Sequence, residues 1–183
     1  MGICDYNRKG TWYIKKTLIN IYMANIKTIQ GDIVRRILSA KFYFFKYITK
    51  KPNVYYNMYP LVFSLGKVNK NLFQGIDFHY LPPKQRIVLL EDLRNITPSL
   101  VKSPVRFAAE FRKLMVKVRK YKLAKVAFKR YNIDSIISGK IIRIKPEDWD
   151  EAIQEPVEKF ISPTGSKVSS RKVWKEMLKL QKR

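Results

Sequence analysis

The sequence contains little cysteine, little histidine and few acidic side chains, and it has no long uncharged apolar run. The one cysteine, Cys4, excludes an internal disulfide framework and a zinc site made of cysteines, and it fits a reducing compartment. Because no apolar run approaches the roughly 18 residues that a transmembrane helix needs, we expect no membrane partner. Lysines interrupt the apolar residues near the N-terminus, so no secretory signal is expected.

Groups that carry catalysis are equally scarce. His79 is the only histidine, so any Ser-His-Asp or Cys-His site would have to use it, and no nucleophile elbow accompanies it. No glycine-rich phosphate loop occurs, which argues against an NTPase. A histidine among aromatic residues is typically hydrogen-bonded and structural. We therefore expect no catalytic residue, no metal site and no cofactor.

A magnesium-dependent nuclease is the enzymatic alternative, since such enzymes need clustered carboxylates and often a nearby lysine. Asp77, Glu91 and the pair Glu158-Lys159 are the candidates. They do not form an array on adjacent predicted strands, because the strand predicted over residues 140–145 carries no carboxylate. The nuclease stays the weaker hypothesis.

What the sequence has in excess is positive charge. Among 183 residues, 38 are Lys or Arg and 14 are Asp or Glu, which gives a net charge of +24 and a pI near 10.2. The hydrophobic content of 46% is enough for a packed core, so the chain is not a disordered basic tail. Such a domain is expected to meet a polyanion, and nucleic acid is the favoured partner, including nucleic acid inside a virion or a ribosome.

The positive charge is concentrated in two segments. Residues 102–130 hold eleven Lys or Arg against Glu110, and residues 167–183 hold seven against Glu176. Cations that lie off the apolar face of a helix can follow a phosphate backbone, although a solvated charged face is the alternative. No helix-turn-helix, zinc finger or RNP motif is present, so sequence-specific reading is not expected. The predicted DNA contacts are Arg106, Arg112, Lys113, Lys117, Arg119, Lys120, Lys125, Lys129, Arg130, Arg171, Lys172 and Lys175.

Acidic and aromatic residues each allow two interpretations. The acidic block comprises Glu147, Asp148, Asp150, Glu151, Glu155 and Glu158. It either balances the basic helices within the molecule, which we favour, or docks a basic partner such as another copy of the chain. Aromatic side chains could stack on the bases of a single strand, although aromatic residues in strands are more often core. The candidates for stacking are Trp12, Tyr55, Tyr56 and Tyr59.

The apolar spacing predicts the order of elements. Strands are expected over residues 42–48, 59–65, 72–80 and 140–145, the second and third forming a hairpin. Helices are expected over residues 33–40, 84–93, 105–122 and 123–131, with a short acidic helix from Pro146 and a last helix capped by Ser169 or Ser170. Thr97-Pro98 and Ser103-Pro104 are predicted breaks. In the helix over residues 84–93, Ile87, Leu90 and Leu93 are the predicted inward face.

These elements predict an α+β fold, because strands do not alternate with helices throughout. The architecture expected is a small twisted antiparallel sheet or SH3-like barrel with a helical insertion and a C-terminal helix. The expected organisation is an N-terminal extension or helical arm over 1–40, an α+β domain over 41–165, and a basic C-terminal helix or tail over 166–183.

Four stretches resemble a family of small virion-associated proteins of T4-like tailed bacteriophages, of the DNA end-protector type. They are residues 59–63 (YPLVF), 73–83 (FQGIDFHYLPP), 144–149 (IKPEDW) and 156–160 (PVEKF), accompanied by Arg86, Leu89, Leu90 and Ala152. The resemblance covers residues 40–175. The family pattern has Asn where this chain has Asp77, whereas His79 and the two following prolines match it.

The resemblance implies a myovirus structural protein located in the virion and assembled in the host cytoplasm. Its expected partners are the DNA backbone at the end of the packaged genome and other virion proteins. Exposed sheet edges would suit a homo-oligomer. The alternative is a baseplate, tail or neck assembly subunit whose basic face contacts proteins instead of DNA. On charge alone, a ribosomal-type RNA-binding protein also fits.

Overall fold

The computed structural model describes residues 31–49, 55–103, 105, 109–110, 112–114, 116, 124–137, 141–156 and 158–180. The largest element is a six-stranded antiparallel sheet in the order β1-β7-β2-β4-β5-β6. Its strands are β1 (Asp32–Val34), β2 (Phe42–Phe44), β4 (Leu61–Lys67), β5 (Leu72–Asp77), β6 (Phe128–Asn132) and β7 (Ile141–Ile144). Among the described strands, β1 and β6 are the open edges, so the sheet is not closed into a barrel. The predicted α+β class with a small antiparallel sheet is confirmed.

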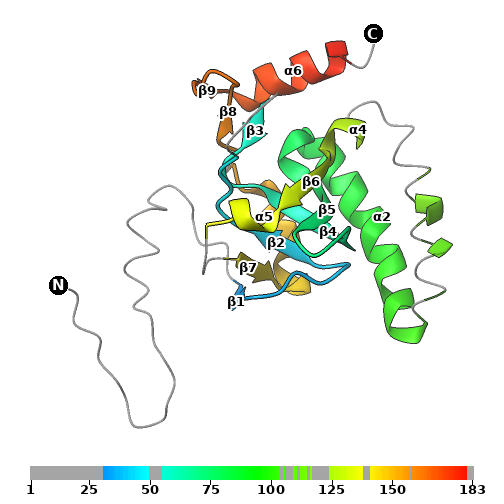
Figure 1. Ribbon diagram of the computed structural model, residues 1–183. Coiled ribbons are helices and arrows are strands. Elements are labelled where there is room, and N and C mark those ends of the chain that lie inside the picture. The colour runs from blue at the N-terminus through cyan, green and yellow to red at the C-terminus, as the bar shows by residue number, and fades with distance from the viewer. Residues whose placement is uncertain are drawn as a thin grey trace.

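A second sheet of three short strands lies beside the C-terminal helix. It contains β3 (Tyr56–Asn57), β8 (Phe160–Ile161) and β9 (Lys167–Val168), in the order β3-β8-β9. The helix α6 (Ser170–Leu180) follows β9 directly. In Figure 1 this small sheet and α6 lie together at one end of the molecule, whereas α2 (Pro83–Lys102) runs along the main sheet.

The remaining elements are short. They are η1 (Phe78–Tyr80), α4 (Ala124–Ala127), η2 (Ile133–Ser135), η3 (Pro146–Asp148) and α5 (Trp149–Gln154). The predicted acidic helix after Pro146 is η3 with α5, and its carboxylates lie in the first turn, where the helix macrodipole favours them. The predicted final helix is α6, and the Ser169 hydroxyl accepts a hydrogen bond from the Lys172 N–H at 3.4 Å.

Apolar residues cover both faces of the main sheet at its centre. All three residues of β2 are buried, because Phe42 and Phe44 face one core and Tyr43 faces the other. The larger core packs under α2, α5 and α6 and includes Trp149, which contacts Phe42 edge-on at 5.1 Å. Successive strand residues point to opposite faces. The aromatic run at residues 42–45 therefore contributes side chains to both cores.

A close approach of two strands explains the glycine in the FQGIDFHY stretch. Gly75 in β5 pairs with Ser64 in β4 next to an irregularity in the strand register. A Cβ at Gly75 would stand 2.2 Å from the Cγ1 of Val62 and 2.9 Å from the carbonyl oxygen of Phe63. Only a residue without a side chain fits this contact.

Two predicted elements are wrong. The helix expected over residues 33–40 is replaced by β1, which pairs with β7 through Ile33 and Ile142. The helix expected over 123–131 ends at Ala127 and continues as β6, which pairs with β5. In both segments pairing with a strand distant in the sequence overrides the local helical spacing.

The strand expected over residues 72–80 ends at Asp77, and η1 follows it. The helix expected over 84–93 continues to Lys102 as α2, through the predicted break at Thr97-Pro98, whereas Ser103 is outside it. A proline inside a helix removes one backbone hydrogen bond but does not always end the helix.

The inward face of α2 also differs from the prediction. Leu90 and Leu93 are buried as expected, but Ile87 is 44% exposed. Leu89 and Arg86 take the inner positions instead. In the next predicted helix, over residues 105–122, apolar residues recur at steps of three and four, which predicts one buried face. Of these, Leu114 is buried, and the others, Phe107, Phe111, Val118 and Tyr121, lie outside the described residues.

Candidate nucleic-acid interface

A single helical turn, η1, connects the main sheet to the small sheet and to α6. The N–H of His79 donates to the Asp77 carboxylate at 3.0 Å, which caps this turn at the end of β5. All three residues of η1 are buried. The HYLPP stretch continues into α2, because a proline is well suited to the first turn of a helix.

Asp77 is a carboxyl group without solvent exposure. It accepts hydrogen bonds from the His79 N–H and from the Tyr131 hydroxyl, the latter at 2.9 Å. Burial raises the pKa of Asp77 to about 7, although both hydrogen bonds and the nearby charge of Lys129 oppose this rise. Burial also raises the pKa of Tyr131 well above its usual value. The hydrogen bond between Tyr131 and Asp77 links β6 to β5 within the core.

The side-chain amide of Asn57 sets the protonation of His79. The Asn57 Oδ1 accepts the backbone N–H groups of Tyr59 at 3.1 Å and of Lys159 at 3.2 Å. Its Nδ2 therefore donates to the His79 Nδ1 at 2.7 Å, which leaves the histidine proton on Nε2. Burial, and then the charge of Arg86, lowers the pKa of His79 well below its usual value. The ring is therefore neutral and accepts a hydrogen bond at Nδ1.

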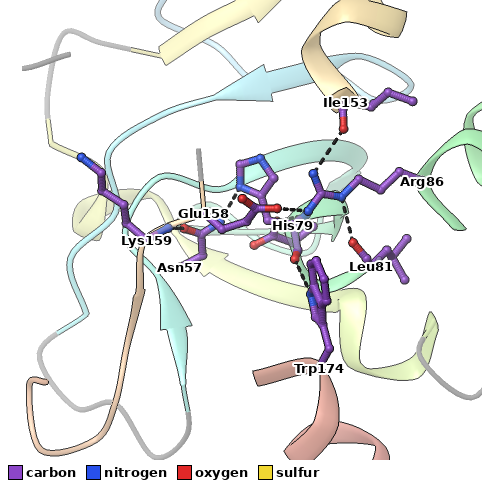
Figure 2. Close-up of polar contacts among 9 residues, drawn as sticks. Asn57, His79, Leu81, Arg86, Ile153, Glu158, Lys159 and Trp174 are labelled. Atoms are coloured by element: carbon purple, nitrogen blue, oxygen red, sulfur yellow. Dashed lines mark hydrogen bonds and ion pairs between the residues drawn. The ribbon is translucent and has the colours of Figure 1, made fainter. Parts of the chain in front are cut away.

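Arg86, which lies near this histidine, joins three segments of the chain. Its Nε donates to the Leu81 carbonyl at 2.8 Å and its Nη1 to the Ile153 carbonyl at 3.2 Å. Its Nη2 pairs with the Glu158 carboxylate. Figure 2 shows these contacts converging from α2, α5 and the segment before β8. Because the guanidinium is almost fully buried, its hydrogen bonds and its ion pair both have to be satisfied.

Trp174 attaches α6 to the same cluster. Its indole N–H donates to the His79 carbonyl at 2.9 Å, and the Arg86 guanidinium lies 5.8 Å from its ring centroid. Figure 2 shows the indole directed from α6 toward His79. We call the group of Asn57, His79, Arg86, Glu158 and Trp174 the polar junction. The junction positions the basic helix α6 relative to the rest of the fold.

The structure brings two of the predicted basic segments together around η1. Both α4 and α6 contact η1. Lys125 on α4 is exposed, as are Arg171, Lys172 and Lys175 on α6. These four residues are called the η1-flanking cations below. Of them, Lys172 lies 3.9 Å from Glu176, and the others make no ion pair within the described part of the chain.

Lys129 differs from the other predicted contacts. Its ammonium group lies 4.1 Å from the centroid of the Tyr80 ring, and the residue is only partly exposed. Burial lowers the pKa of Lys129, although the Asp77 charge opposes this. Arg130, the next residue in β6, is exposed. Lys129 therefore lies against Tyr80 of η1 with its side chain partly buried, unlike the exposed cations of α4 and α6.

The other predicted contacts divide into described and undescribed residues. Arg112 and Lys113 are exposed on helical residues. Arg106, Lys117, Arg119 and Lys120 lie outside the described residues, as does Trp12. Of the aromatic candidates for stacking, Tyr59 is buried and Tyr55 and Tyr56 are partly buried.

Two of the six acidic-block residues pair with arginines of α2. Glu158 pairs with Arg86, and Asp150 makes a bidentate pair with Arg94 at 2.9 and 2.7 Å. The first pair is buried and the second is exposed. Both partners lie on α2 and not on the basic segments that the favoured interpretation named, so these two pairs leave that interpretation untested.

The carboxylates considered for a nuclease lie apart. Asp77 is fully buried, whereas Glu91 is exposed on α2. In the described part of the chain, no group of three or more His, Cys, Asp or Glu residues is placed to hold a metal ion. Over those same residues, no helix has the length and the apolar character needed to cross a membrane.

Sequence reasoning missed the polar junction, although one signal was present. Arg86, Leu89, Leu90 and Leu93 have the spacing of one helix face, and all four are buried. An arginine at an inward-facing position requires an internal partner. Nothing in the local sequence indicates that this partner is Glu158, 72 residues away.

Comparison with known proteins adds one positive finding. The family model described as Phage T4 terminal DNA protecting protein matches residues 7–177. Neither a curated protein nor a solved structure matches the chain. The match includes all four stretches on which the resemblance rests, together with η1 and the polar junction. Because it spans almost the whole sequence, the chain belongs to the phage T4 terminal DNA protecting protein family.

Proposed function

We propose that this protein binds the end of a phage genome by contacting the DNA backbone without reading its sequence. Membership of the terminal DNA protecting family supports a role at a DNA end. The observation that carries the proposal is the set of exposed cations on α4 and α6, two helices that both contact η1, with α6 attached there by Trp174 of the polar junction. Fixed cations attract phosphates of any sequence and release condensed counterions on contact.

On this proposal the protein is a non-enzymatic component of the virion. Its role is to cover the end of the packaged DNA and to contact neighbouring virion proteins. No catalytic step is needed, because protection follows from occupying the end. Further phosphate contacts would come from Arg112, Lys113 and Arg130, which are also exposed.

The test is a binding titration with duplex DNA at several salt concentrations. The variant Lys125→Gln/Arg130→Gln/Arg171→Gln/Lys175→Gln removes four exposed cations. If all four contact phosphates, the slope of log affinity against log salt should fall by about 3–4. The loss should be the same for unrelated DNA sequences.

The matched control removes four exposed lysines that do not lie on α4, β6 or α6. The variant is Lys67→Gln/Lys70→Gln/Lys84→Gln/Lys145→Gln. It makes the same change in net charge and should leave most of the salt slope intact. Equal losses in both variants would refute a defined interface. Absence of DNA binding, together with salt-insensitive association with virion proteins, would favour an assembly subunit of the tail, neck or baseplate.

A further inference from the structure

A pocket lies between the small sheet and the start of α6. Its volume is about 440 Å³, within the range of about 300–1,000 Å³ that is usual for small-molecule sites. Much of its lining is apolar and comes from β8, β9 and the residues after β3. These residues are Met58, Tyr59, Phe160, Ile161 and Val168. A pocket of this size and lining suits a nucleobase, whose flat face can pack on apolar side chains, together with its sugar.

Two exposed lysines give the same pocket a positive rim. Lys159 and Lys167 both line it, and Ser169 at the start of α6 borders it. Glu158 also lines the pocket, but its carboxylate is paired with Arg86 in the polar junction. The acid is therefore balanced internally, so the two lysines determine the sign of the pocket's charge. An apolar lining with a cationic rim fits a nucleotide.

Hydrogen bonds hold the two sides of the pocket together before any ligand arrives. The Asn57 Oδ1 accepts the N–H groups of both Tyr59 and Lys159, which belong to two segments far apart in the sequence. The N–H of Met58 donates to the Lys159 carbonyl at 2.9 Å. The Lys159 ammonium group lies 5.4 Å from the Tyr59 ring centroid. Figure 2 shows the Lys159 side chain extending away from His79 and the polar junction. A preformed site loses little conformational entropy on binding.

The pocket adjoins the proposed DNA-binding surface. Ser169 lines the pocket, and the exposed Arg171 and Lys172 follow it on α6. A duplex whose backbone contacts α6 would therefore have its last nucleotide near Lys159 and Lys167. An internal nucleotide is stacked on both sides and must be flipped out of the duplex to enter a pocket, whereas a terminal nucleotide is stacked on one side only and enters at a lower cost.

We propose that this pocket receives the 5′-phosphorylated terminal nucleotide of duplex DNA, with Lys159 and Lys167 binding its phosphate. The inference rests on the proposed function, because it assumes that the duplex lies against α6. It adds that the protein distinguishes an open end from continuous duplex by its terminal phosphate. Two charge-assisted contacts should give a preference of about tenfold or more for the open end.

The experiment uses one duplex sequence in three forms. The first form has open ends with 5′-phosphates, the second has open ends with 5′-hydroxyls, and the third has both ends closed by hairpin loops. The full chain should bind the first form about tenfold more tightly than the third. The second form separates the two parts of the site, since it keeps the terminal nucleotide and removes only its phosphate.

The pocket variant is Lys159→Gln/Lys167→Gln. It should lose the preference for phosphorylated ends and keep most of its affinity for the closed duplex, which also shows that it is folded. The control Lys70→Gln/Lys145→Gln makes the same charge change at exposed lysines that do not line the pocket. It should keep the preference.

Three results would overturn the inference, and they are distinguishable. Equal affinity of the unaltered protein for all three forms would refute end recognition and leave backbone binding intact. A preference that survives in the pocket variant would place end recognition elsewhere. Failure of the unaltered protein to bind any duplex would refute the proposed function and the pocket's role together.

Discussion

The polar junction and the η1-flanking cations use charge in opposite ways. In the junction, Arg86 is almost fully buried and has three protein partners. On α4 and α6, Lys125, Arg171 and Lys175 are exposed and make no ion pair within the described part of the chain. A buried charge needs fixed partners and so determines geometry, whereas an exposed charge remains available to an outside polyanion. Arg86 therefore holds together the segments that it joins, whereas Lys125, Arg171 and Lys175 can contact a ligand.

The largest expected effect comes from removing the buried guanidinium. Arg86→Met should lower the free energy of unfolding by about 3–5 kcal/mol, because the Glu158 carboxylate and two carbonyl groups lose their donor. Denaturant unfolding measures this loss. The control is Arg94→Met on the same helix, which breaks the exposed pair with Asp150 and should cost about 1 kcal/mol or less. Similar losses in the two variants would contradict the comparison.

The second effect concerns Asp77 and depends on pH. Its pKa is about 7 in the folded protein, against a usual value of 3.8. Between these values the folded chain holds a proton that the unfolded chain has released, so this group's contribution to stability is lost as pH rises. Asp77→Asn removes the ionisation and keeps an acceptor for the His79 N–H. The variant should gain up to about 4 kcal/mol over the unaltered protein above pH 7.

Unfolding of both proteins from pH 4 to pH 8 tests this expectation. The gain should be small near pH 4 and should reach a plateau above pH 7. His79 titrates with the opposite sign, since its lowered pKa removes stability as pH falls below about 6.5. Both proteins contain this histidine, so its effect cancels in the difference between them. A difference that does not change with pH would show that Asp77 is ionised throughout.

The smallest effect on stability is expected where the effect on binding is largest. The variant Lys125→Gln/Arg130→Gln/Arg171→Gln/Lys175→Gln should change the free energy of unfolding by only about 0.5 kcal/mol per site or less, since all four residues are exposed. Self-repulsion at a net charge of +24 would make part of this change stabilising. Thermal unfolding at low and high salt measures it. A large loss of stability would mean that these cations hold the fold together.

Sequence patterns predicted the elements whose signals are local. The aromatic run at Phe42, the hairpin of β4 and β5, the alternating strand β7 and the capped helix α6 all appear. The edge strands β1 and β6 were missed, because each is defined by pairing with a strand distant in the sequence. Local spacing cannot report such pairing.

The candidate site divides in the same way. Charge surplus alone pointed to the two basic segments, and the structure exposes the cations of α6 and Lys125 as expected. The polar junction could not be predicted, since it depends on contacts among Asn57, His79, Arg86, Glu158 and Trp174. The half-buried position of Lys129 against Tyr80 depends on β6, which the sequence indicated as helix.

The contact between Trp174 and His79 also has an optical consequence. The indole is partly buried, donates to a carbonyl and lies beside a guanidinium. Indole emission shifts to longer wavelength when water replaces such surroundings. Trp174 belongs to the helix that carries Arg171, Lys172 and Lys175, so its fluorescence follows the attachment of that helix to the sheet. The protein therefore contains its own spectroscopic probe of the surface proposed to meet DNA.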